Sequence, residues 1–301
     1  MSGTNSGISV STLLVNYFKG FLMGGADIIP GVSGGTMALI VGIYERLIEA
    51  ISQVFNFAFA LVRFKFAEAG KIFKEIEWSL ILPLGIGIGS AIFLLASIIN
   101  HFLTTYPIEC RGLFFGLITA SVAIPWLRAK DRGPSKMVIA VIACAAAFLS
   151  AGLTPQEIPN PSTWQIFGAA AIAICAMILP GVSGAFLLLV MGLYAPTTAA
   201  IKALDFGYIA IFGAGAVVGM GAFSRFLKWL LANHHDATMA ALVGLMIGSL
   251  RALWPWQTED RGLHMPTENE PVLWVIVLAI IGFVVVSALV WWEHSRKQHT
   301  H

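Results

Sequence analysis

Ten long apolar segments constrain the fold of this chain more than any other feature of its sequence. Each is longer than a typical buried strand, and Gly and Ala are frequent in them, as in membrane helices that pack closely. Only 11% of the 301 residues are charged, compared with about 25% in soluble domains. The sequence therefore predicts an all-α polytopic membrane protein. The segments comprise residues 13–29, 32–51, 78–99, 112–126, 137–153, 164–179, 182–200, 206–231, 237–254 and 272–292.

The pentapeptide Pro-Gly-Val-Ser-Gly occurs at residues 30–34 and again at residues 180–184, each time inside apolar sequence. The match continues in the same register, so that Gly42 pairs with Gly192. A second block also repeats, but its two copies lie closer together, which means that a loop is shorter in the second half. Two blocks repeated in the same order predict an internal duplication. Further matching positions are Tyr44 and Tyr194, Gly85 and Gly213, Gly87 and Gly215, Gly116 and Gly244, and Ser121 and Ser249.

The duplication divides the chain into two predicted repeats and a connection. We expect residues 1–136 to form the first repeat, residues 137–163 a connecting span with an outer loop, and residues 164–301 the second repeat. Residues 56–77, which lack a counterpart in the second half, mix phenylalanines with lysines and arginines. That pattern favours an amphipathic helix at the membrane surface, with a cytosolic linker as the alternative.

Basic residues indicate how the two repeats are oriented in the membrane. If both termini are cytoplasmic, all but four of the 18 Lys and Arg fall on the cytoplasmic side, as the positive-inside rule expects. Each half contains five apolar segments, an odd number, so the second half is predicted to be inverted relative to the first. We expect each half to form a Pro-Gly-broken hairpin followed by three transmembrane helices, an inverted-topology repeat typical of secondary transporters. The four exceptions are Arg111, Lys202, Arg251 and Arg261.

The repeated motif predicts a binding site for an oxyanion. Pro and Gly break the helix, and the amide groups and positive dipole end of the helix that follows favour an anion. Two such ends, entering from opposite sides, are expected to converge near the middle of the membrane and to hold a phosphate group. The alternative is a tightly packed helix kink without a ligand. The predicted substrate-binding residues of the motifs are Gly31, Ser33, Gly34, Gly35, Thr36, Gly181, Ser183 and Gly184.

Four charged residues complete the predicted site. Asp27 precedes the first motif in apolar sequence, and an ionisable group there is a candidate for ion coupling, with Glu45 as a second. A local helix cap is the alternative role for Asp27. Arg111 and Arg251 lie near the expected outer ends of two spans, where either could bind a phosphate or extend to the membrane interface.

An enzymatic function is disfavoured by the same residues. Residues 31–35 match the pattern G-x-S-x-G, but a nucleophilic serine needs a base, and no histidine lies centrally in a later apolar segment. The three cysteines are widely spaced, without the spacing of metal ligands. We therefore expect no catalytic residue, no metal and no cofactor. The net charge of +2 gives no indication of nucleic acid binding.

Residues 24–36, Gly-Gly-Ala-Asp-Ile-Ile-Pro-Gly-Val-Ser-Gly-Gly-Thr, resemble the signature of the PopT-type polyprenyl-phosphate translocases. Residues 115–118, 248–251 and 254–256 are similar to other characteristic blocks of that family. The resemblance implies that undecaprenyl phosphate, the lipid carrier of envelope synthesis, is moved across the inner membrane from the outer to the inner leaflet. Proton or sodium coupling remains open. The alternative is an ion-coupled small-anion transporter with the same fold.

Overall fold

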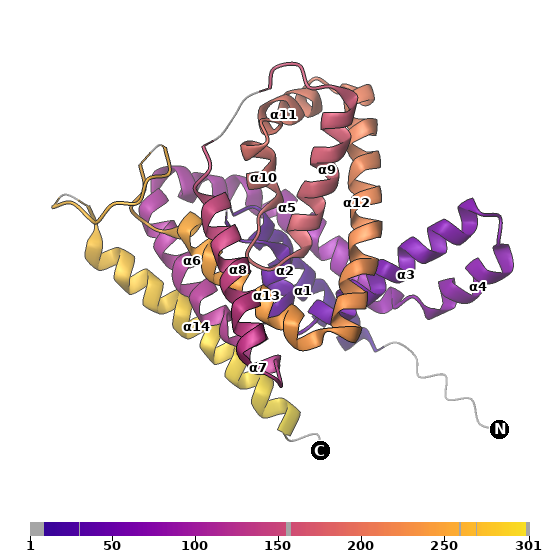
Figure 1. Ribbon diagram of the computed structural model, residues 1–301, viewed down its shortest axis with the longest axis horizontal. Coiled ribbons are helices and arrows are strands. Elements are labelled where there is room, and N and C mark those ends of the chain that lie inside the picture. Colours follow the sequence, from indigo (N-terminus) through magenta and orange to yellow (C-terminus); the bar gives the residue numbers. More distant parts are fainter. Residues whose placement is uncertain (1–8, 30, 155–157, 259, 269, 299–301) are drawn as a thin grey trace.

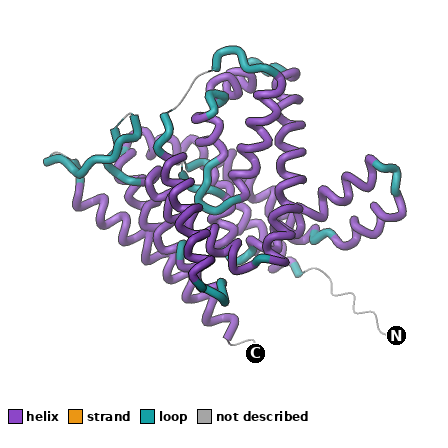
Figure 2. Tube along the Cα trace, viewed as in Figure 1, coloured by secondary structure: helices purple, strands orange, loops and turns teal. Residues whose placement is uncertain are grey.

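The computed structural model describes residues 9–29, 31–154, 158–258, 260–268 and 270–298, and within these ranges the fold is helical (Figures 1 and 2). The described part contains no strand, only an isolated bridge between Gln257 and Leu263. The helices of the first half are α1 (Val10–Asp27), α2 (Gly34–Ile40), α3 (Tyr44–Val62), α4 (Phe66–Glu75), α5 (Trp78–Thr105), α6 (Pro107–Ser121), α7 (Ala123–Arg128) and α8 (Pro134–Ala151). Those of the second half are α9 (Thr163–Ile178), α10 (Gly184–Val190), α11 (Tyr194–Lys202), α12 (Phe206–Asn233), α13 (His235–Ser249), a 3₁₀ turn η1 (Leu250–Leu253) and α14 (Val272–Gln298).

Six helical stretches of the described chain are long and apolar enough to cross a membrane. In five of them fewer than half of the side chains are buried within the bundle, as expected for helices that face lipid. The prediction of an all-α polytopic membrane protein is therefore confirmed. The six stretches are Trp78–Thr105, Pro107–Arg128, Pro134–Ala151, Phe206–Asn233, His235–Leu253 and Val272–Trp291.

Two of the apolar segments expected to form continuous helices are divided in the structure. Residues 32–51 form α2 and the start of α3, and residues 182–200 form α10 and α11. The divisions fall at Gly42, with a φ of 73°, and at Gly192, with a φ of 77°. Only glycine adopts such left-handed angles at little cost, and α10 and α11 are bent by 109° there. Hydropathy alone does not show such a break.

The amphipathic stretch also differs from the single helix that we expected. The long helix α3 continues to Val62, the chain turns through Phe64 with a φ of 59°, and α4 packs back against α3. The rings of Phe57 and Phe73 hold the two helices together, with their centroids 5.4 Å apart. The resulting helical hairpin projects from the bundle at the right of Figure 1.

Helix bounds and packing repeat between the two halves. The bounds of α5 and α6 recur in α12 and α13 in the register that pairs Gly116 with Gly244, and α2 and α10 begin at the matching glycines of the two motifs. In the same way α1 packs along α5 and α9 packs along α12. The last helix of each half crosses over, since α8 packs on α13 and α14 packs on α6.

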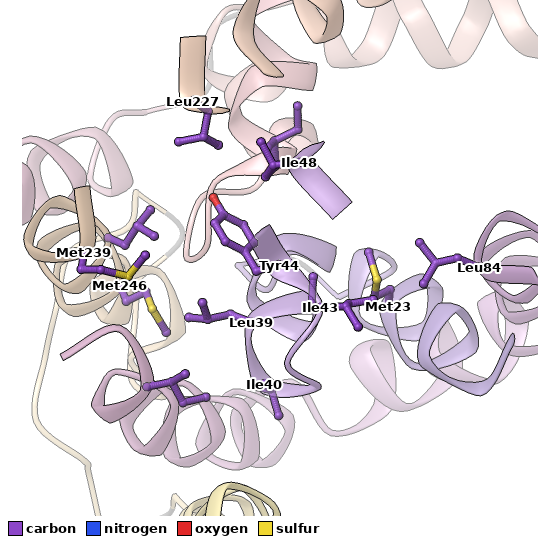
Figure 3. Close-up of a cluster of buried hydrophobic side chains, with 14 of the residues drawn as sticks. Met23, Leu39, Ile40, Ile43, Tyr44, Ile48, Leu84, Leu227, Met239 and Met246 are labelled. Carbon is purple, nitrogen blue, oxygen red and sulfur yellow. The ribbon is translucent and has the colours of Figure 1, made fainter. Parts of the chain in front are cut away.

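The buried core lies where the halves meet. Tyr44, at the start of α3, is fully buried, and its hydroxyl points toward Leu227 of α12 (Figure 3). Leu39 of α2 and Met239 and Met246 of α13 belong to the same cluster. Short α2 therefore sits in the interior, enclosed by helices from both halves, and the first motif precedes it directly.

Candidate functional site

Hydrogen bonds link each of the two Pro-Gly-Val-Ser-Gly motifs to a residue beside the other motif. The Thr36 Oγ1 atom accepts a bond of 2.9 Å from the Gly181 N–H, and the Ser33 hydroxyl donates one of 3.0 Å to the Leu179 carbonyl. Gly31 and Gly181 both have left-handed backbones, with φ values of 88° and 84°. The two motif regions thus lie side by side, while their convergence from opposite sides of the membrane stays a prediction.

Several of the backbone N–H groups that were expected to face an anion instead donate hydrogen bonds to side chains of the protein. Ser33 is the N-cap of α2 and accepts a bond of 3.2 Å from the Thr36 N–H. The Asp27 Oδ1 atom accepts a bond of 2.5 Å from the Gly34 N–H, which is the capping role considered for it from sequence. Ser183 is the N-cap of α10, as Ser33 is of α2, and its hydroxyl accepts a bond of 3.3 Å from the Phe186 N–H.

The motif glycines allow close packing of the backbone. A Cβ atom on Gly34 would meet the Asp27 carboxylate, and one on Gly35 would meet the carbonyl of Ile178. Gly184 faces the carbonyl of Ala173 in the same manner. In this conformation, these three positions therefore lie against protein, and contact between them and a phosphate stays a prediction.

A cavity of about 290 Å³, here called the arginine cavity, lies next to the first motif. It is enclosed by the ends of α5 and α6 that meet at residue 106, by η1, by the loop that follows η1, and by α10. Gly31 forms part of its wall, so the first motif borders it. Its polar lining consists of Arg111, Gln257, Thr258 and Arg261, and its apolar lining includes Ile29, Leu103, Phe114, Phe186 and Leu253.

Two arginines give this cavity its charge. Arg111 of α6 donates a bond of 3.4 Å from Nη1 to the Pro255 carbonyl, and Arg261 lies 4.3 Å from the centre of the Phe186 ring. Partial burial, and to a smaller extent the Arg111 charge, lowers the pKa of the Arg261 guanidinium from its ordinary value. The ion pairs formed by the described residues include neither arginine. Such a site suits an anion with several oxygen acceptors.

Arg261 was not among the predicted site residues. It comes to the cavity because the loop after η1 folds back, with Arg261 itself at a φ of 61°. The available signal was that Arg261 is one of four basic residues predicted to lie away from the cytoplasmic side. Sequence alone does not reveal the path of such a loop.

A smaller space, separate from the arginine cavity, lies beside the second motif. It measures about 30 Å³, and Gly181 and Ser183 are in its wall together with Ser150 and Ser249. Gly31 borders both spaces. The second motif therefore lies beyond Gly31 as seen from the arginine cavity.

The structure places the remaining candidates away from the arginine cavity. Arg251 stacks on Phe148, with 4.6 Å from its guanidinium carbon to the ring centre, and donates to the Phe148 carbonyl at 3.2 Å. Glu45 lies at the start of α3, where its carboxylate is 3.6 Å from Arg128 and 3.7 Å from the imidazole of His235. Their predicted roles in capture and coupling stay predictions.

The bundle of long apolar helices defines a multi-pass membrane protein, and two arginines give one of its cavities a positive charge. Residues 23–270 match the family model described as undecaprenyl phosphate translocase-like, and the chain belongs to this family. It is 40% identical over 264 residues to a polyprenyl-phosphate transporter of Vibrio cholerae, covering 86% of this chain and 84% of the relative. It is 32% identical over 296 residues to a polyprenyl-phosphate transporter of Staphylococcus aureus, covering 91% of this chain and 95% of the relative. No solved structure matches the chain.

Proposed function

We propose that this protein transports undecaprenyl phosphate, or a similar polyprenyl phosphate, across the inner membrane. Transport runs from the outer to the inner leaflet and returns the lipid carrier for another round of envelope synthesis. Both curated relatives are named for polyprenyl-phosphate transport and cover most of this chain, which supports the substrate class. The proposed process moves the lipid without breaking a covalent bond.

The arginine cavity is the observation that carries this proposal. A phosphate group is costly to move into the membrane core, because its charge loses the solvation of water. Arg111 and Arg261 would replace part of that solvation with charge-assisted hydrogen bonds. The cavity borders Gly31, so a bound phosphate would already lie next to the motif.

The proposed topology is an inverted repeat with both termini in the cytoplasm. The distribution of basic residues supports it, and so do the recurring helix bounds and the paired packing of α1 with α5 and of α9 with α12. In this orientation, the arginine cavity faces the outer side, between the start of α6 and the loop after η1. The motifs would then meet between hairpins that enter from opposite sides.

Ion pairs on the proposed cytoplasmic side favour an outward-facing state. Glu49 of α3 lies 2.8 Å from the ammonium of Lys228 on α12, and Glu45 pairs with Arg128 of α7. These pairs link α3 to α12 and to α7 on that side. Alternating access would require them to separate as the lipid phosphate leaves toward the inner leaflet.

The motif residues and Asp27 belong to the step between the two sides. A phosphate that replaces the Asp27 carboxylate at Gly34 would first be repelled by it, and a proton or sodium ion on Asp27 would remove that repulsion. We therefore propose Asp27 as the coupling group, with Glu45 as a second candidate. The proposed phosphate ligands during this step are Gly31, Ser33, Gly34, Gly35, Thr36, Gly181, Ser183 and Gly184.

Leaflet transfer in reconstituted vesicles tests the function. Wild-type protein should speed the movement of undecaprenyl phosphate between leaflets, and Arg111→Ala and Arg261→Ala should each slow it by about tenfold or more, because each removes a charged partner of the phosphate. Lys202→Ala is the matched control, since Lys202 is basic, exposed and also on the proposed outer side. Absence of transfer by the wild type, together with uptake of a soluble anion, would favour the small-anion transporter. Wild-type rates in both arginine variants would refute the assigned site.

A further inference from the structure

An apolar groove of about 700 Å³ begins beside the arginine cavity and runs between α5, α6 and α14. It shares Leu103 and Phe114 with that cavity, so the two spaces adjoin. Phe102, Tyr106 and Trp274 in its wall are 51%, 50% and 65% exposed. This first groove therefore opens to the outer surface of the bundle, where lipid surrounds the protein.

A second apolar groove of about 380 Å³ occupies the corresponding place in the repeat. Leu230 and Ala241 in its wall are the repeat counterparts of Phe102 and Leu113, which are in the wall of the first groove. It lies between α12, α13 and α8, the counterparts of α5, α6 and α14. The two grooves are thus repeat-related.

The helices that cross over between the halves match as well. Gly116 of α6 faces the backbone of Ala279 on α14, and Gly244 of α13 faces the backbone of Ala140 on α8. One residue before each alanine, Leu278 lines the first groove and Ile139 lines the second. The correspondence therefore holds on all three walls.

Of the two grooves, only the first shares wall residues with a cavity lined by arginines, as far as the described part of the chain shows. The counterpart of Arg111 in the second half is Met239, which is fully buried in the core. The counterpart of Phe114 is Leu242, with 1% of its surface exposed. Buried apolar side chains thus stand at both of these positions in the second half.

We propose that the two grooves hold the first isoprene units of the lipid substrate in turn. This inference rests on the proposed function. The first groove takes the tail while the phosphate is in the arginine cavity, and the second takes it after the phosphate has crossed. Lipid tails are as apolar as the groove, so the gain comes from close packing and from fixing the phosphate in position. A soluble phosphate lacks this second contact.

Filling the first groove tests the first half of the inference. Leu278→Trp puts an indole into the groove, and Ile280→Trp, on the same helix and 56% exposed to lipid, is the matched control. Binding is measured with farnesyl monophosphate and with inorganic phosphate on protein in nanodiscs. We expect Leu278→Trp to weaken the binding of farnesyl phosphate about three- to tenfold, because dispersion contacts with the tail are lost. The affinity for inorganic phosphate should be unchanged. Partitioning of the probe into lipid is the same for both variants.

Filling the second groove tests the other half. Ile139→Trp should leave farnesyl phosphate binding unchanged but slow the leaflet transfer of undecaprenyl phosphate about three- to tenfold. The reason is that the lipid tail enters the second groove only after the phosphate has crossed. Ile142→Trp, on the same helix and 63% exposed, is its control and should transfer at the wild-type rate.

The outcomes separate this inference from the proposed function. Equal farnesyl phosphate affinity in Leu278→Trp and Ile280→Trp would refute binding of the tail in the first groove. Equal transfer rates in Ile139→Trp and Ile142→Trp would refute binding of the tail in the second groove. In both cases loss of transfer in Arg111→Ala would still support the function itself. Should Leu278→Trp fail to fold, Cys110→Phe fills the same groove from α6 and carries the same expectation.

Discussion

Thr36 and Gly181 are 145 residues apart in the sequence, and the Thr36 hydroxyl oxygen accepts a hydrogen bond from the Gly181 amide. The bond joins a residue just after the first motif to the second motif, and Thr36 is fully buried. A side chain beside the first motif therefore accepts the hydrogen bond of a backbone N–H in the second motif. The counterpart of Thr36 is Phe186, which has no hydroxyl, so its side chain cannot accept the equivalent hydrogen bond from the first motif.

Replacing Thr36 with valine should destabilise the protein. Valine has the same shape but no acceptor, so the buried Gly181 amide loses its partner, at a cost of about 1–3 kcal/mol. Thermal unfolding of the purified protein, followed by tryptophan fluorescence, measures the effect. Thr198→Val removes an exposed hydroxyl that bonds only to the Ala195 carbonyl and should leave the unfolding temperature unchanged. Equal unfolding temperatures for Thr36→Val and wild type would contradict the role of this bond.

Two substitutions of Asp27 should separate its capping role from its charge. Asp27→Ala removes the acceptor of the Gly34 amide and should cost about 0.5–2 kcal/mol of stability. Asp27→Asn keeps an acceptor oxygen, so it should retain most of that stability and yet lose the dependence of transport on a proton or sodium gradient. The measurements are thermal unfolding and leaflet transfer with and without each gradient. A full gradient dependence in Asp27→Asn would remove Asp27 from the coupling step.

Close approach of α6 and α14 should depend on Gly116. A Cβ atom there would overlap the backbone of Ala279, whereas one on Gly85 meets nothing within 4 Å. We expect Gly116→Ala to destabilise the protein by about 1–3 kcal/mol through overpacking. Gly85→Ala should be neutral or slightly stabilising, because alanine favours the helix. Thermal unfolding of both variants, each in the same detergent, checks the contrast, and equal stability would argue against the packing of these two helices.

Stability at low pH should depend on Asp131. A hydrogen bond from Lys136, then the Gly133 amide and the Lys136 charge, hold the pKa of the Asp131 carboxyl below its usual 3.8. A lowered pKa in the folded state stabilises the protein above the unfolded value, and this contribution is lost as the pH falls below about 4. Asp131→Asn should therefore flatten the decline of the unfolding temperature between pH 5 and pH 3, by a small amount because the carboxylate is exposed to solvent. Identical pH profiles of the variant and the wild type would contradict this.

Arg251 should contribute to stability more than to substrate affinity. Its guanidinium packs on Phe148 and donates to the carbonyl of that residue, and it does not line the arginine cavity. We expect Arg251→Ala to lower the unfolding temperature, while farnesyl phosphate affinity stays within about twofold of wild type. A tenfold loss of affinity with unchanged stability would support the capture role predicted from its position in the sequence.

Sequence reasoning located the helices well because hydropathy and length determine where a chain can cross a membrane. It also predicted a duplication from repeated blocks with matching glycines such as Gly42 and Gly192, and the helix bounds recur in the same register. It did not identify the breaks at these glycines, because a left-handed turn inside an apolar run leaves the composition unchanged.

The site was predicted less completely than the fold. The motif contact follows from the duplication, but the capping of Gly34 by Asp27 depends on side-chain geometry between positions that are not adjacent in the chain. Two arginines, Arg111 and Arg251, were predicted to bind the substrate. Of these, Arg111 lines the arginine cavity and Arg251 does not. Arg261 depends on the fold of the loop after η1, and loop paths are set by tertiary contacts that a single sequence does not display.

The exchange of α8 and α14 between the halves limits how this protein can be made. During synthesis α8 is complete well before α13, its main packing partner, has been translated, so one face of α8 stays in contact with lipid until the second half inserts. For the same reason a gene encoding residues 1–154 alone would yield a bundle with an unmatched helix, and the missing α14 would leave α6 uncovered.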